Sequence, residues 1–386
     1  MEDDDTTGPA GQVNNFDNQE ANMPPLPLYK ATVTEAIKRG ENIMFTINAS
    51  KAAEESGCVV LRQHEDIEWL HHNLVTGNAT EGVIIPPLPV KPLSDPKSAE
   101  SMSRKHLGDN TKVMRGDQFE GDCKAVQKYL ELMLSHSTFG RDKNLEKFLT
   151  EEEAPVRARL NKGLISRLGS AIDSARKANR KDVDDYFQDQ RNFANEFSKA
   201  VKDASLNYNK LIVAQWRLSS SYRNLATDFT TCTAEMRDEP LIKVNKLMKL
   251  VSEGCEDEAG SLELRSGQSE LTLGFFLELY ARYSDALKDM HFRRTSALVD
   301  YESCEKALEK AKPAKKAAAE EAYNTAKKIF ETSSEQAKKE IKSFTQQRLL
   351  SSAEALTAYA ELQMKISQDF YSQLFHTRKH VLELRL

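Results

Sequence analysis

Apolar residues recur at steps of three and four through the second half of the chain, from about residue 183 to the end. This spacing places apolar side chains on one face of an α-helix. The clearest stretches are Leu218, Tyr222, Leu225 and Phe229, then Leu279, Tyr283, Leu287 and Met290, then Leu349, Ala353, Leu356, Ala360 and Met364. The second half is therefore predicted to be almost entirely helical.

Breaks in this pattern divide the second half into three long helices. Pro240 can end or kink a helix, the run 252–267 is rich in Gly, Ser and acidic residues, and Pro313 stands where a second long helix would stop. A helix of roughly 50 to 70 residues would be about 75 to 105 Å long. Because helices of this length seldom pack fully within one subunit, a coiled coil, a repeat or a dimer is the expected context.

Shorter apolar runs in residues 29–152 predict an α+β domain. Runs around 33–37, 43–47 and 58–61, separated by polar and Gly-containing breaks, predict a three-stranded antiparallel sheet. Segment 83–92 must be extended, because its prolines block both helices and ladder hydrogen bonds. Helical spacing predicts helices over residues 65–75, 119–134 and 144–149.

Composition narrows the class of protein. A charged fraction of 29%, a mean hydropathy of −0.59 and a net charge of −5 are typical of a soluble protein. No apolar stretch reaches the length of a membrane span, and acidic residues stand where a signal peptide would be basic. Five cysteines without CxxC spacing favour reduced cytosolic thiols.

The first 28 residues are expected to be a disordered acidic tail. Residues 1–25 contain six acidic residues and no Lys or Arg. The proline-rich run 24–27 fits either an SH3-type ligand or a short extended linker.

Residues 154–181 combine an apolar stripe with a basic face. Val156, Leu160, Leu164, Leu168 and Ile172 repeat at four-residue steps. The same range holds one acidic residue and eight basic residues, namely Arg157, Arg159, Lys162, Arg167, Arg176, Lys177, Arg180 and Lys181. Such a helix lies in a lipid interface with its cations toward anionic headgroups. The alternative is a linker helix packed on the first long helix.

Catalysis is not expected from this sequence. The chain has no GxxxxGK[ST], GxGxxG, HExxH or GxSxG motif. The adjacent His71 and His72 would point in different directions on a helix, so they do not suggest a metal site. We expect a binding protein with no cofactor, no metal and no nucleic-acid partner.

Two strings carry a resemblance to a known family. Residues 62–70, RQHEDIEWL, and 84–92, IIPPLPVKP, resemble the PX domain of a sorting nexin, and the helical half resembles the BAR domain that follows it there. These strings, with RRT at 293–295 and DYE at 300–302, resemble the sorting nexin 5, 6 and 32 subgroup. The resemblance implies an α+β PX domain at 29–152, a linker helix at 153–181 and an all-α three-helix BAR domain at 182–386 that forms a curved dimer.

The sequence departs from the PX family at the lipid pocket. Most PX domains hold phosphatidylinositol 3-phosphate with an Arg at the position of Gln63, an aromatic ring at that of His64 and another Arg near 122–123. An amide, an acid or a thiol does not replace a bidentate guanidinium, so the pocket is expected to be lost. Arg62 and Lys91 remain candidates for weak headgroup binding, with a solvated surface role as the alternative.

The resemblance implies a cargo-binding role instead. In the subgroup an insertion after the proline loop makes a groove where an extended peptide adds to the sheet. The groove aromatic corresponds to Phe119, for which a core or cap role is the alternative. The insertion here, 93–118, is shorter than usual.

A second basic cluster flanks Pro313. In a BAR dimer this turn is at the tip of each arm, where membrane contact is expected, although a charge run is usually a solvated face. The cluster consists of Lys310, Lys312, Lys315 and Lys316, and Lys288, Arg293, Arg294 and Lys306 are candidates for the concave side.

The function implied by the resemblance is membrane remodelling and cargo retrieval at the early endosome. The implied partners are a sorting nexin 1 or 2 type PX-BAR protein or a second copy, cargo receptor tails, anionic or phosphoinositide-containing membranes, and retromer and dynein-dynactin. The alternative is a soluble coiled-coil scaffold that reaches membranes only through partner proteins.

Overall fold

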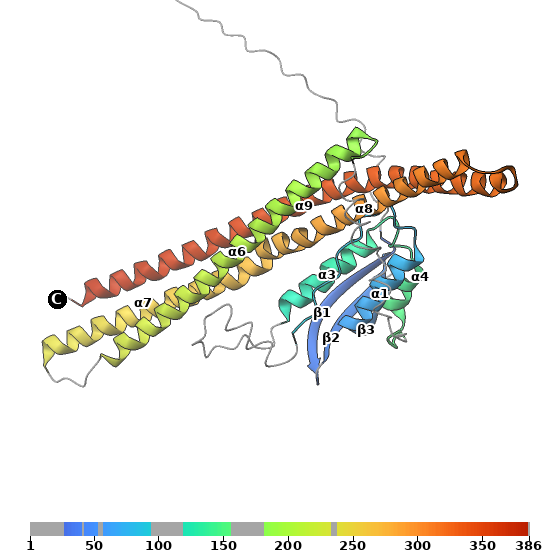
Figure 1. The fold of residues 1–386 in the computed structure, drawn as a ribbon. Helices are drawn as coiled ribbons and strands as arrows, with labels where there is room; N and C mark the ends of the chain where they lie inside the picture. Colours follow the sequence, from blue (N-terminus) through green and yellow to red (C-terminus); the bar gives the residue numbers. More distant parts are fainter. Residues whose placement is uncertain are drawn as a thin grey trace, which may run out of the picture.

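The computed structural model describes residues 27–40, 42–52, 57–93, 119–155, 181–232 and 238–384. An α+β unit built on a three-stranded sheet lies against the middle of a long helical bundle (Figure 1). This confirms the predicted order of an α+β domain followed by a helical region. The predicted acidic tail falls almost wholly on residues 1–26, which lie outside the described residues.

The sheet is a simple antiparallel meander. Its strands are β1 (Tyr29–Arg39), β2 (Asn42–Lys51) and β3 (Gly57–Gln63), in the order β1-β2-β3. Gly40 takes a φ of 64° between β1 and β2, a left-handed conformation that favours glycine. Ile43, Phe45 and Ile47 are buried at alternate positions of β2, as the two-residue period of a strand requires. The predicted sheet is therefore correct.

Three helices cover the sheet, and each lies where the sequence predicts one. They are α1 (His64–Gly77), α3 (Glu120–Leu134) and α4 (Lys143–Thr150). Leu70, Leu130 and Phe148 meet the sheet in one core and are fully buried. Segment 83–92 is neither helix nor strand, as its prolines predict.

Three long helical stretches form the bundle. The first is α6 (Asp185–Thr231). The second is one continuous helix made of α7 (Glu239–Ser269), the π-helical turn η3 (Glu270–Gly274) and α8 (Phe275–Glu309). The third is α9 (Lys316–Glu383), which follows the 3-10 turn η4 (Pro313–Lys315). Pro240 lies in the first turn of α7, where its missing N–H is tolerated. Pro313 begins the turn before α9, so both prolines mark helix boundaries as predicted.

The run 252–267 is not a break, which corrects the prediction. It lies within α7 because small residues at seven-residue steps, Ser252, Ala259 and Ser266, are buried there, Ser252 and Ala259 closely against α6. Ser219 Oγ donates to the carbonyl of Ala259 at 2.9 Å, and Ser252 Oγ donates to that of Ala226 at 2.8 Å. Tertiary packing thus overrides the weak intrinsic helix propensity of Gly and Ser.

None of the helices in the described ranges has an apolar stretch long enough to cross a bilayer.

Candidate functional site

Large apolar side chains are exposed on the half of the bundle where α6 ends, α7 begins and α9 ends. Figure 1 shows these three helix ends at the same end of the bundle. On α6, Leu211, Leu218 and Leu225 recur at seven-residue steps. On α9 the exposed large apolar residues from position 349 onward fall on one side of the helix and are Leu349, Leu350, Leu356, Met364, Tyr371, Leu374, Phe375 and Leu382. We call these two sets the apolar stripes.

The apolar helix positions predicted from the sequence fall into two groups, one buried within the chain and one exposed in the apolar stripes. Leu279, Tyr283 and Leu287 are buried within the chain, packed with Phe344 of α9. In contrast, Tyr371 on the α9 stripe is 70% exposed. Exposed apolar surface of this extent marks a protein–protein or membrane contact. The stripes can therefore bury apolar area against a partner helix bundle.

The lysine cluster lies at the opposite end of the bundle. Lys310, Lys312, Lys315 and Lys316 are all exposed around the turn between α8 and α9. This end is the tip of the elongated bundle (Figure 1). Four clustered cations with free approach from solvent can bind an anionic surface, each with about 1 kcal/mol near a charged membrane.

The basic helix predicted for residues 154–181 falls on residues 156–180, which lie outside the described residues. The same holds for its candidate membrane residues, which are Arg157, Arg159, Lys162, Leu164, Arg167, Leu168, Arg176 and Lys177. The prediction stands untested.

Arg62 does not face solvent, which corrects its assignment as a headgroup ligand or surface residue. Its side chain is fully buried and donates to the carbonyls of Phe148, at 3.0 Å, and Glu151. It thus satisfies the carbonyls at the C-terminal end of α4, which have no partner within the helix. Desolvation lowers the pKa of this guanidinium, but carbonyl acceptors on several sides hold it in place.

The other residues of the expected lipid pocket are occupied by internal contacts. Gln63 caps α1 in a reciprocal pair with Asp66, and its backbone N–H lies 2.9 Å from Asp66 Oδ2. His64 Nε2 lies 2.9 Å from the carbonyl of Pro89. Lys91 Nζ lies 2.5 Å from Glu65 Oε1 in an exposed pair. Of the two candidate headgroup ligands, Arg62 and Lys91, an anion can therefore reach Lys91.

Asp122 makes the remaining pocket position unfavourable for phosphate. Burial, and secondarily the Glu278 carboxylate of α8, raises the pKa of Asp122 to about 6. Near neutral pH this carboxyl is mostly ionised and repels anions. The loss of the lipid pocket stays a prediction, which the internal contacts of Arg62, Gln63 and His64 support.

Phe119 precedes α3 as its N-cap residue. Its side chain is half-buried against the core of the α+β unit, and its carbonyl accepts from Cys123 N at 2.8 Å. This geometry fits the cap and core role. The insertion before it falls on residues 94–118, outside the described ranges, so peptide binding by Phe119 stays a prediction.

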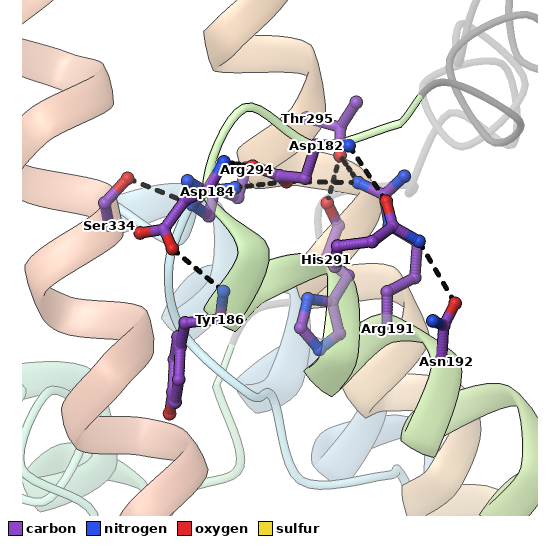
Figure 2. Close-up of polar contacts among 10 residues, drawn as sticks. Asp182, Asp184, Tyr186, Arg191, Asn192, His291, Arg294, Thr295 and Ser334 are labelled. Atoms are coloured by element: carbon purple, nitrogen blue, oxygen red, sulfur yellow. Dashed lines mark hydrogen bonds and ion pairs between the residues drawn. The ribbon is translucent and has the colours of Figure 1, made fainter.

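Arg293 and Arg294 do not line an open concave surface, which corrects that prediction. Arg293 donates to the carbonyls of Thr80 and Val83 in the α+β unit. Arg294 is 2% exposed and donates from Nη1 to Asp182 Oδ2 at 2.5 Å (Figure 2). Its guanidinium carbon also lies 3.4 Å from the centroid of the Phe187 ring. Lys288 and Lys306 remain at least partly exposed on α8.

A buried polar network surrounds Arg294 and was missed by sequence reasoning. Arg191 Nη2 donates to Thr295 Oγ1 at 2.5 Å and lies 3.4 Å from Asp182 Oδ2, while Arg294 Nε donates to Ser334 Oγ at 3.0 Å (Figure 2). The network joins the start of α6 to α8 and α9. Its only sequence signal is the RRT string, which gives no hint of the acceptors.

His291 lies beside this network and gives the fold a defined pH dependence. Burial, then the charges of Arg191 and Arg294, lower the pKa of His291 from 6.5 to about 4. The unfolded chain then binds the extra proton between pH 6.5 and 4, so the free energy of unfolding falls as the pH drops through this window.

We expect His291→Met to remove this loss. Relative to the variant, the wild-type chain should lose about 1 to 2 kcal/mol of unfolding free energy between pH 7.5 and pH 5, measured by urea denaturation. His376→Met, at an exposed position of α9, is the matched control. Equal pH profiles for the wild-type and His291→Met chains would contradict the assignment.

No group of three or more metal-ligating side chains occurs within the described ranges. The five cysteines, all described, are free thiols at dispersed positions.

Comparisons with known proteins agree with this geometry. Residues 51–152 match the PX domain family. The chain is 28% identical over 362 residues to sorting nexin-6 of Homo sapiens, covering 86% of each chain. It is 29% identical over 363 residues to sorting nexin-32 of Homo sapiens, covering 86% of this chain and 88% of the relative.

The solved cryo-EM structure of the SNX-BAR Mvp1 tetramer has the same fold. It is 13% identical with a TM-score of 0.52, over 91% of this chain and 99% of that one. The resemblance to PX-BAR sorting nexins of the 6 and 32 type is thus confirmed. Proteins of this type are non-enzymatic, peripheral membrane-trafficking proteins, while the domain boundaries at 29, 153 and 182 stay predictions.

Proposed function

We propose that this chain, a homologue of sorting nexin-6 and sorting nexin-32 with a PX-BAR fold, works as a dimer that binds or induces curvature on early endosomal membranes. The observation that carries the proposal is the placement of the apolar stripes at one end of the bundle and the exposed lysine cluster at the other. A dimer joined through the stripes has a cationic tip at each far end. Its partner is a sorting nexin 1 or 2 type protein or a second copy.

The PX domain then sorts transmembrane cargo by its cytoplasmic tail for retrieval to the Golgi or for recycling. The internal contacts of Arg62, Gln63 and His64 support peptide binding over phosphoinositide binding. β1 is an edge strand, the kind of element to which an extended peptide adds. Gln127 of α3 already pairs with Ala31 O and Val33 N, so an added peptide pairs farther along β1.

The second candidate is a scaffold that reaches membranes only through partner proteins. The observation in its favour is that Arg293 and Arg294, expected to face the membrane, are engaged in internal contacts. Retromer and dynein-dynactin stay expectations from the family resemblance alone.

A liposome sedimentation assay distinguishes the two. The full chain, alone and mixed with a sorting nexin 1 type partner, is spun with vesicles of endosomal composition, and tubules are scored by electron microscopy. We expect each of two variants to lower the amount of vesicle-bound protein at least tenfold. One is the cluster variant, Lys310→Glu, Lys312→Glu, Lys315→Glu and Lys316→Glu together, and the other is Leu164→Glu with Leu168→Glu. In the cluster variant we also expect vesicle binding to lose its dependence on salt concentration.

A smaller charge change away from the turn, Lys327→Glu with Lys338→Glu on α9, is the control for position. No binding by the chain alone, together with unchanged binding by both variant sets when the partner is present, would favour the scaffold.

A further inference from the structure

The proline-rich segment of the PX domain is buried between that domain and the bundle. Val83 and Ile84 are each 1% exposed, although the segment has no regular secondary structure. Ile84 packs in the core of the bundle with Leu279 and Tyr283 of α8. A buried irregular backbone needs hydrogen-bond partners, because unpaired N–H and C=O groups are costly away from water.

Two arginines of α8 supply donors to three carbonyls of this segment. Arg293 donates from Nε to Thr80 O at 2.9 Å and from Nη2 to Val83 O at 2.6 Å. Arg282 donates from Nη1 to Leu88 O at 2.9 Å. The two arginines are about three helical turns apart and so lie on the same side of α8. Only a guanidinium presents the rigid fork that two carbonyls require.

α9 completes the contact from its own side. Ile84 N donates to Glu340 Oε2 at 3.2 Å, and His136 Nε2 of the PX domain lies 3.2 Å from the same oxygen. Gly82 passes so close to α9 that an added Cβ would lie 2.1 Å from the carbonyl oxygen of Ser333. A side chain at position 82 therefore cannot be accommodated without moving the backbone.

The far end of the segment is tied back to the PX domain. His64 Nε2 lies 2.9 Å from Pro89 O. The segment is thus held by the bundle at residues 80–88 and by α1 at residue 89.

We propose that residues 80–89 form a clasp that fixes the PX domain on the bundle, with Arg293 as the positioning residue that closes it. The two parts then move as one body, and the apolar side chains of Val83 and Ile84 are withheld from any membrane. This inference goes beyond the proposed function and concerns the chain in solution, so a failure to bind liposomes does not affect its test.

The test is hydrogen exchange by mass spectrometry on the full chain. In the wild-type protein we expect peptides over 80–90 to be as protected as those of the bundle core. Arg293→Ala and Gly82→Ala, which act from opposite sides of the contact, should each speed exchange at 80–90 at least tenfold. Peptides over 42–51 of β2 should stay unchanged, and small-angle scattering should show a broader distribution of interatomic distances.

Two further variants separate positioning from general stability. Arg293→Lys, which keeps the charge but loses the fork, should recover less than half of the protection. Lys288→Ala, on the same helix but paired with Asp285 of that helix, should behave as wild type.

Fast exchange at 80–90 in the wild-type chain would overturn the clasp, as would wild-type exchange and scattering in Arg293→Ala. If Gly82→Ala also speeds exchange in the β2 peptides, Glu340→Ala becomes the deciding variant for the clasp. It removes the acceptor of the Ile84 amide from the bundle side. Wild-type protection in Glu340→Ala would then count against the clasp.

Discussion

Leu356→Asp combined with Tyr371→Asp should raise the dimer dissociation constant at least 100-fold. Both residues lie on the apolar stripe of α9, where they are 55% and 70% exposed in the single chain. In a dimer joined through the stripes each new carboxylate is buried without a partner, which costs several kcal/mol, and about 1.4 kcal/mol corresponds to a tenfold change in the constant. Analytical ultracentrifugation of the chain alone and with a sorting nexin 1 type partner measures the effect.

Ile329→Asp is the matched control for this experiment. Ile329 is also on α9 and 45% exposed, but it lies toward the lysine-bearing tip and outside the apolar stripes. We expect its dissociation constant to stay within about threefold of wild type. Dimers of Leu356→Asp with Tyr371→Asp that are as tight as wild type would show that the stripes are not the subunit interface.

Arg294→Met should lower the free energy of unfolding by about 3 to 5 kcal/mol. It removes the closest donor to Asp182, whose side chain is 1% exposed. The carboxylate of Asp182 then stays buried, and Arg191, at the longer distance of 3.4 Å, is its remaining cationic partner among the described residues. Breaking one side of a buried ion pair costs this much because the other charge stays desolvated. Urea denaturation at neutral pH measures the loss.

The double variant Asp182→Leu with Arg294→Met tests the reason for that loss. Since it removes both charges, it should recover at least half of the stability. Lys288→Met breaks the exposed pair with Asp285 and should cost less than about 1 kcal/mol. Additive losses in the double variant would mean that the two side chains do not depend on each other.

Local rules account for the parts of the fold that were predicted. Alternation in β2, helical spacing in α8 and the prolines at 240 and 313 act within a few residues, so the sequence displays them. The run 252–267 was misjudged for the opposite reason. Its Gly and Ser content lowers intrinsic helix propensity, while the close contact of Ser252 and Ala259 with α6 depends on residues more than twenty positions away.

The site was predictable where it depends on residue identity and not where it depends on distant partners. The absent pocket arginine at Gln63 and the exposed lysine cluster were both evident from the sequence. Arg62 and Arg294 were misplaced, because a basic residue gives no sign of its acceptor. Phe148 O lies 86 positions from Arg62, and Asp182 lies 112 positions from Arg294.

The π-helical turn changes how one continuous helix is used along its length. Buried residues recur every seven positions on both sides of the turn, and the spacing across the turn is fourteen. They are Ser252, Ala259 and Ser266 before the turn and Tyr280, Leu287 and Arg294 after it. A π turn holds an extra residue, so the later half is rotated by about a quarter turn relative to a continuous α-helix. The small buried side chains of the first half allow α6 to pack closely. The larger buried side chains of the second half share one core with residues of α6 and α9. Removing one residue from 270–274 would swing both clasp arginines about 100° away from the PX domain.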